Sequence, residues 1–124
     1  MTYDDRESVI QGADYTYTAS VKVNAADPAV KAWYTLKANL TDADPGALQK
    51  AVTTSNSAGT GQITADGSVG GNCTIRFDIT ATNTTALSPR TYFFDVKVKT
   101  NSGAFAYGAQ GVLAAVQNVT TTTT

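Results

Sequence analysis

The most constraining feature of the sequence is the stretch from Leu87 to Lys99, where apolar and polar residues alternate. After a turn-forming segment from Leu87 to Arg90, one side of the stretch carries Tyr92, Phe94, Val96 and Val98, and the other carries Thr91, Phe93, Asp95, Lys97 and Lys99. This period of two is typical of a strand with one buried face. The stretch therefore predicts a β-strand whose first set of side chains faces a hydrophobic core.

Similar alternation predicts further strands along the chain, at 8–11, 14–24, 30–40, 62–65, 72–80 and 104–116. Residues 47–52 fit either one helical turn or a short strand, and Gly108 and Gly111 indicate a bulge or a close backbone approach in the last strand. About seven strands at roughly 8–15-residue spacing, with almost no helix signal, predict an all-β, immunoglobulin-like antiparallel β-sandwich. A partly closed barrel is the structural alternative.

Composition narrows the classes of function. The chain has 124 residues, of which 42% are hydrophobic and 15% charged, and this balance suits one domain with a core rather than a disordered tail. The net charge of −1 argues against a nucleic-acid or membrane-surface partner. There is no histidine, which removes Ser-His-Asp and Cys-His catalysis and most zinc and copper sites. We expect no enzyme activity and no cofactor, and we expect the single cysteine, Cys73, to be buried packing.

The chain divides into three predicted regions: an extended N-terminal arm at 1–7, the sandwich at 8–119 and a flexible Thr tail at 120–124. The N-terminus has no apolar run behind it, and no stretch approaches the length of a membrane-spanning helix, so we expect a soluble protein without a signal peptide. Because extended segments can add a strand to a neighbour's sheet, contact candidates in the arm and tail are Asp4, Asp5, Arg6, Thr120 and Thr121. The alternative is that both ends are disordered.

Two pairs of carboxylates are candidates for a chemical site. Asp42 and Asp44 are spaced for a hard cation such as Ca²⁺, but the surrounding segment fits plain turn chemistry better and supplies too few oxygen ligands. Asp78 and Asp95 would suit a glycosidase-like pair only if they lay close together, and cross-strand pairing with Arg76 or Lys97 is the simpler expectation. The sequence therefore predicts no catalytic residue and no metal site.

Trp33 and Phe93 are the strongest candidate contact residues. Each falls on the side of its strand opposite the apolar set. Exposed aromatic side chains on a sandwich face indicate an interface with another subunit. They would also serve to stack on sugar rings, and a loop or the chain's own arm covering the second face is the third alternative.

Several short motifs resemble a known family of small phage virion modules. They are Asp5-Arg6 followed by Ile10-Gln11-Gly12, the stretch from Leu87 to Val98, the hairpin Asn101-Ser-Gly103, and the closing segments Gly111-Val-Leu and Val116-Gln-Asn-Val-Thr120. Together they resemble the immunoglobulin-like module at the N-terminus of phage baseplate upper proteins and in related tail, fibre-adaptor and head proteins. Ala13, Arg90 and Asn118 depart from that pattern, and 53–71 matches none of its motifs.

The resemblance implies a non-enzymatic structural protein of a bacteriophage virion, made in the host cytoplasm. We expect it to dock as a β-sandwich adaptor in the tail, baseplate or fibre region, with other phage structural proteins and copies of itself as partners. A capsid decoration protein on the head surface is the alternative. A carbohydrate-binding module with a host-surface sugar as its ligand is the third reading.

Overall fold

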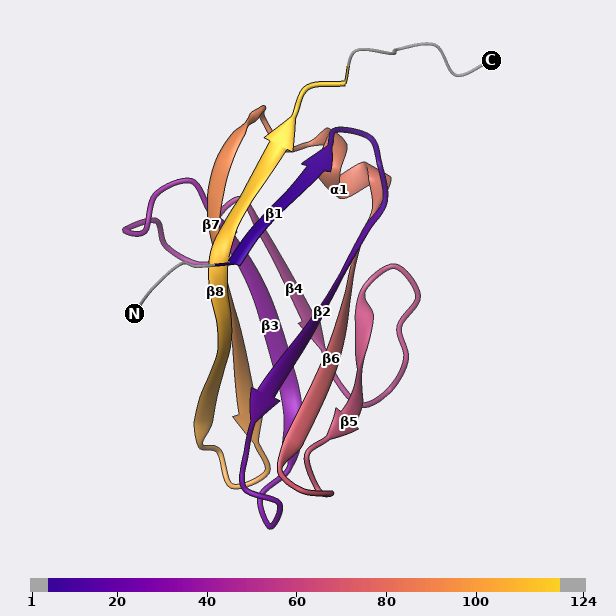
Figure 1. Ribbon diagram of the computed structural model, residues 1–124, viewed down its shortest axis with the longest axis vertical. Coiled ribbons are helices and arrows are strands. Elements are labelled where there is room, and N and C mark those ends of the chain that lie inside the picture. Colours follow the sequence, from indigo (N-terminus) through magenta and orange to yellow (C-terminus); the bar gives the residue numbers. More distant parts are fainter. Residues whose placement is uncertain (1–4, 119–124) are drawn as a thin grey trace.

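The alternating strands form two β-sheets (Figure 1). Their apolar side chains form the hydrophobic core of the sandwich. The computed structural model describes residues 5–118. The first sheet has the order β1 (Asp5–Ile10), β8 (Phe105–Val116), β7 (Arg90–Thr100), β3 (Ala29–Lys37) and β4 (Leu48–Val52). The second sheet has the order β2 (Tyr15–Lys22), β6 (Asn72–Ile79) and β5 (Gly61–Asp66).

This strand order is that of an immunoglobulin-like sandwich. The strands β2, β6 and β5 occupy the places of strands B, E and D, whereas β3, β7 and β8 occupy those of C, F and G in the facing sheet. The strand β4 extends that second group as strand C′ does in variable-type domains. The prediction of an all-β, immunoglobulin-like sandwich is therefore confirmed.

The N-terminal strand differs from the expectation in its start and its direction. It begins at Asp5 rather than Ser8, so Asp5, Arg6 and Glu7 belong to the sheet and not to a free arm. It runs parallel to β8, from the pair Asp5↔Gly111 to the pair Ile10↔Val116, so this one pair departs from the antiparallel arrangement expected for the sandwich. After β1 the chain crosses to the three-stranded sheet, where it forms β2, so β1 has no hairpin partner next to it in sequence. Its neighbour in the five-stranded sheet is instead the last strand, β8. The Thr tail at 120–124 and Asp4 lie outside the described residues.

Two segments take structures that the sequence left open or missed. Residues 48–52 form the edge strand β4, which brings the described part of the chain to eight strands. Residues 81–86, where the sequence pattern predicts no strand, contain a one-turn helix, α1 (Ala81–Thr85). Thr80 caps this helix, because its hydroxyl accepts from the Asn83 amide while the Asn83 side chain accepts from the Thr80 amide.

Aromatic rings fill the centre of the sandwich. The ring of Tyr34 lies 5.5 Å from that of Tyr17, 5.3 Å from that of Phe94 and 5.5 Å from that of Phe77, measured between centroids. Antibody domains place a tryptophan on strand C against a B–F disulfide. Here strands β3, β2 and β7 bring Tyr34, Tyr17 and Phe94 together instead, so aromatic packing joins the two sheets without a covalent link.

A hydrogen bond of the tyrosine-corner type fixes the start of β7. The hydroxyl of buried Tyr92 donates to the Ser88 carbonyl oxygen at 3.0 Å. A tyrosine near the start of strand F that bonds back to the preceding backbone is a hallmark of immunoglobulin-like domains. The bond closes the connection between α1 and β7 and so sets the register of the strand that carries Phe93, Asp95 and Lys97 on its outer side.

Candidate contact surface on the five-stranded sheet

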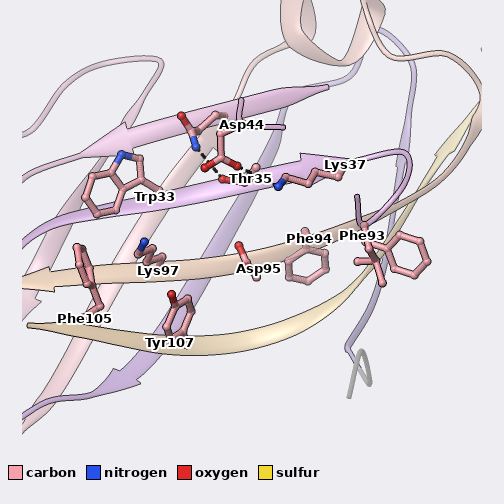
Figure 2. A pocket seen from close by; sticks show the side chains of 12 residues that line it. Trp33, Thr35, Lys37, Asp44, Phe93, Phe94, Asp95, Lys97, Phe105 and Tyr107 are labelled. Atoms are coloured by element: carbon pink, nitrogen blue, oxygen red, sulfur yellow. Dashed lines mark hydrogen bonds and ion pairs between the residues drawn. The ribbon is translucent and has the colours of Figure 1, made fainter. Parts of the chain in front are cut away.

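The outer surface of β3, β7 and β8 forms a concavity of about 500 Å³ (Figure 2). We call it the aromatic face, defined by Trp33, Thr35, Lys37, Gln49, Phe93, Asp95, Lys97, Phe105 and Tyr107. The side chains of Phe105 and Tyr107 are more than half exposed, at 53% and 54%. Trp33 and Phe93 are half-buried and line the same concavity. Large exposed aromatic side chains gathered in one place mark a surface that contacts another molecule.

A β-bulge explains why Phe105 and Tyr107 point outward. Opposite β7, the register shifts between the pairs Asp95↔Gln110 and Lys97↔Tyr107, so β8 carries one extra residue there. The shift moves the outward side of β8 from even to odd positions towards its start. Gly108 lies at the shift, where a side-chain Cβ would lie 2.7 Å from Val21 Cγ2. The expected bulge or close approach at Gly108 is therefore confirmed.

Lysine side chains are interleaved with the aromatic rings. Trp33, Lys97 and Tyr107 are cross-strand neighbours in one row over β3, β7 and β8. Lys97 Nζ lies 4.1 Å from the ring centroid of Phe105 and 5.9 Å from that of Tyr107, and Figure 2 shows Trp33 on the other side of the same lysine. Lys31 Nζ lies 5.1 Å from the centroid of Trp33. These cation–π contacts hold the rings in place while leaving the ammonium groups near solvent.

The floor of the concavity is polar. Gln49 Nε2 donates to Thr35 Oγ1 at 3.0 Å, which ties β4 to β3. Burial raises the pKa of the neighbouring Asp95 carboxyl above its usual value, and the charges of Lys37 and Lys97 offset this only in part. No ion pair to Asp95 occurs within residues 5–118. The carboxylate is therefore a partly desolvated acceptor facing the concavity.

An ion pair borders the concavity. Lys37 Nζ lies 3.1 Å from Asp44 Oδ1, and Asp42 Oδ2 accepts a hydrogen bond from the Asn39 amide at 3.0 Å. Both carboxylates weighed as calcium ligands thus make contacts that stabilise the turn after β3. In the part of the chain that the structure describes, no group of three or more His, Cys, Asp or Glu side chains is placed to hold a metal ion.

The other carboxylate pair is not assembled. Asp78 lies on the outer side of β6 and Asp95 on the outer side of β7, and these strands belong to opposite sheets. Asp78 accepts a hydrogen bond from Arg76 Nε at 3.1 Å. Arg76 is the expected partner, but the pair is not a cross-strand pair, because the two residues lie two positions apart on β6. Asp95 and Lys97 lie on one strand, β7, and form no ion pair with each other among the described residues.

The structure brings some predicted contact residues together and separates others. Trp33 and Phe93 share the outward face, as predicted. Arg6 is exposed and lies in one cross-strand row with Val112 and Phe93. Asp5 instead accepts a hydrogen bond from Tyr17 within the molecule. Thr120 and Thr121, like Asp4, lie outside the described residues.

Sequence reasoning missed Phe105 and Tyr107, because the bulge expected in the last strand was not used to assign which side chains before it face outward. The available signal was the pair of glycines at 108 and 111, which marks where the alternation changes side.

Within residues 5–118, no helix has the length and apolar character needed to cross a membrane.

Known proteins offer this chain only a distant structural similarity. No protein-family model matches the sequence. No curated protein matches it either. Among solved structures, the chain is similar to the extracellular portion of mouse CD200RLa, with 10% sequence identity and a TM-score of 0.35. That alignment covers 91% of this chain, which spans about half (55%) of the length of the mouse chain.

Proposed function

We propose that this protein is a non-enzymatic structural module of a bacteriophage particle that docks on a neighbouring component through the aromatic face. The observation that carries the proposal is the clustering of Trp33, Phe105 and Tyr107 around Lys97 on the outer side of the five-stranded sheet. Tryptophan and tyrosine provide a large contact area at low cost in side-chain entropy, and they dominate the binding energy of protein interfaces.

The location in the particle is proposed from the resemblance of the sequence motifs to phage virion modules. Two of these motifs have clear structural roles. Asp5 and Arg6 lie in β1, and Gln11 and Gly12 form the turn that connects β1 to β2. We place the module in the tail, baseplate or fibre region, with a capsid decoration role as the alternative.

Particle incorporation tests this proposal. A phage that carries Phe105→Ala together with Tyr107→Ala should incorporate less of the protein than the parent phage, because the exposed rings of the docking surface are removed. Val69→Ala is the matched control, since Val69 is an apolar side chain that is 86% exposed and lies outside the aromatic face. Cryo-electron microscopy of the parent particles should show the aromatic face covered by another virion protein. Absence of the chain from purified particles, or equal incorporation of both variants, would overturn the proposal.

The polar floor supports a second candidate function, carbohydrate binding. A sugar ring presents an apolar face that stacks on an aromatic ring, together with hydroxyls that both donate and accept hydrogen bonds. The concavity offers Trp33 as the platform, the Asp95 carboxylate as an acceptor and Lys97 as a donor. Its volume of about 500 Å³ falls in the range of small-ligand sites.

Fluorescence of Trp33, the only tryptophan in the chain, distinguishes this second candidate. Titration with purified host-surface polysaccharides should quench or shift the emission if a sugar stacks on the indole. Asp95→Asn should weaken that response, whereas Asp66→Asn on the other sheet should leave it unchanged. A flat titration with every polysaccharide tested would remove the carbohydrate function and leave the docking function standing.

A further inference from the structure

The N-terminal strand β1 is attached to the sandwich mainly by polar contacts. Its backbone pairs with β8 alone, and Val9 is its only buried apolar side chain, at 6% exposure. Two of its carboxylates bridge to the opposite sheet: Glu7 accepts a hydrogen bond from the Tyr15 hydroxyl, and Asp5 accepts one from the Tyr17 hydroxyl at 2.9 Å. Little apolar surface therefore opposes the release of β1.

The surface that receives β1, which we call the β1 seat, is specific for this acidic strand. It is lined by the hydroxyls of Tyr15 and Tyr17, and with β1 in place burial and the hydrogen bonds to Glu7 and Asp5 raise the pKa of both groups above the usual value for tyrosine. A tyrosine hydroxyl is protonated at neutral pH even without such a shift, so both hydroxyls can donate to the carboxylates of an incoming strand. An acidic residue at every second position of an incoming strand matches their spacing along β2.

A glycine in β8 shapes the same seat. A Cβ atom at Gly111 would lie 2.2 Å from the Asp5 carbonyl oxygen, so the backbone of β1 fits only because no side chain is present there. The β1 seat therefore combines a backbone ladder, two hydroxyl donors and a close approach at Gly111. A strand with the sequence of β1 satisfies all three.

The turn after β1 is anchored independently of the strand. Gln11 Nε2 donates to the Leu87 carbonyl at 2.7 Å, and the Gly12 amide donates to Thr84 Oγ1 at 3.0 Å. Thr84 Oγ1 also donates to the Ala13 carbonyl at 2.8 Å. These bonds tie residues 11–13 to α1 and to Leu87 just after it, so release of β1 can stop at Ile10 and leave the remaining strands closed.

We propose that β1 exchanges between copies of this chain, so that the β1 seat of one copy receives the β1 strand of another. The contacts of the exchanged strand are those of the closed monomer, and the cost of exchange is only that of opening β1. High local concentration, as in a particle with many copies, favours the exchanged form by mass action. The inference concerns the chain in solution and does not depend on the proposed docking function.

Disulfide trapping tests the exchange in the full-length protein. Ser8 and Ala114 are direct partners in the β1–β8 ladder and both point outward, at the strand spacing of about 4.8 Å that permits a disulfide. The double variant Ser8→Cys with Ala114→Cys should close an internal disulfide and so confirm the pairing. A mixture of the two single variants at high concentration should then form a disulfide-linked heterodimer under mild oxidation.

Two controls separate exchange from random collision. Ser8→Cys mixed with Thr18→Cys measures collision, because Thr18 is exposed on β2 in the other sheet. A synthetic peptide spanning Asp5–Ile10 should lower the heterodimer yield by competing for the β1 seat, whereas a scrambled peptide should not. If the double variant closes its internal disulfide and the mixed single variants give no more heterodimer than the collision control, β1 does not exchange. A heterodimer yield that the peptide leaves unchanged would also overturn the proposal, because the link would then form without a vacated seat.

Discussion

The ring of Phe94 stacks on the ring of Tyr34, with centroids 5.3 Å apart and planes inclined by 22°. Both side chains are buried, at 1% and 0% exposure, and they come from neighbouring strands of the five-stranded sheet. Phe94→Ala should therefore lower the free energy of unfolding by about 3–5 kcal/mol, because it removes a fully buried ring and leaves a cavity. Chemical unfolding of the isolated protein measures this loss.

Phe93 provides the matched comparison, because it is the adjacent residue of the same type and is half-buried on the aromatic face. Phe93→Ala should cost clearly less than Phe94→Ala. A loss below about 1 kcal/mol for Phe94→Ala would contradict the burial of its ring.

Tyr92→Phe should lower the free energy of unfolding by about 0.5–1.5 kcal/mol, because it deletes the hydroxyl that donates to the Ser88 carbonyl and preserves the ring. Tyr107→Phe is the control, since its side chain is 54% exposed and its hydroxyl can bond to water in both states. Thermal or chemical unfolding of both variants makes the comparison. Equal stability of Tyr92→Phe and the parent protein would show that the bond to Ser88 contributes nothing net.

The sequence predicted the elements whose patterns are local. The alternation from Leu87 to Lys99 identified a strand with Phe94 inside and Phe93 outside, and the structure places both as expected. The cap of α1 is also local, but Thr80 and Asn83 lie in a Thr-rich segment and lack the Glu or Gln that marks a capping box in a sequence. Local pattern thus accounts for most strands and for two of the four aromatic side chains of the aromatic face, Trp33 and Phe93.

The remaining features depend on contacts between distant parts of the chain. The parallel pairing of β1 with β8 joins residues more than 100 positions apart and leaves no local signature. Glu7 looks like part of a solvated arm in the sequence, and only the fold shows that it meets the Tyr15 hydroxyl. The outward position of Tyr107 depends on a bulge, which one extra residue in β8 creates relative to β7. Patterns within a segment cannot specify a register that another segment imposes.

Asp95→Asn should make the protein more stable at neutral pH. Burial raises the pKa of the Asp95 carboxyl above its usual value of 3.8, so the folded protein binds this proton more tightly than the unfolded chain does. The free energy of unfolding therefore falls as the pH rises from the pKa of Asp95 in the unfolded chain to its higher pKa in the folded protein. Above the folded pKa, the full destabilisation by the charged carboxylate is present.

The difference in stability between Asp95→Asn and the parent should accordingly grow with pH through the acid range and then level off. Urea titrations at a series of pH values measure it. Asp27 and Asp66 contribute a pH dependence of the opposite sign, because hydrogen bonds from nearby residues lower their pKa values. Both groups are present in both proteins, so their contributions cancel when one free energy of unfolding is subtracted from the other at each pH. A difference that does not vary with pH would mean that the Asp95 carboxyl titrates alike in both states.

Cys73 should resist thiol reagents in the folded protein. Its side chain is fully buried, and burial raises the pKa of the thiol to about 11, with a smaller contribution from Asp66. The reactive thiolate is therefore scarce at neutral pH as well as shielded. A chromogenic disulfide reagent should label the protein only after unfolding in denaturant, at one thiol per chain. Rapid labelling under native conditions would show that the β5–β6 side of the sandwich opens readily.

Gly111→Ala should detach β1 while leaving the other strands paired. The added Cβ would lie 2.2 Å from the Asp5 carbonyl oxygen, and a backbone atom cannot move aside as a flexible side chain can. The strain should lower the free energy of unfolding by about 1–3 kcal/mol, or be relieved by release of the strand. Hydrogen exchange followed by mass spectrometry separates these results, because release raises the exchange of the β1 amides and of the β8 amides that face them.

Gly103→Ala is the control for a glycine-to-alanine change without a steric clash, since a Cβ there would meet nothing within 4 Å. Its φ of 92° adds backbone strain, but only within the hairpin. Unchanged protection of β1 together with unchanged stability would show that the strand does not rely on the close approach at Gly111.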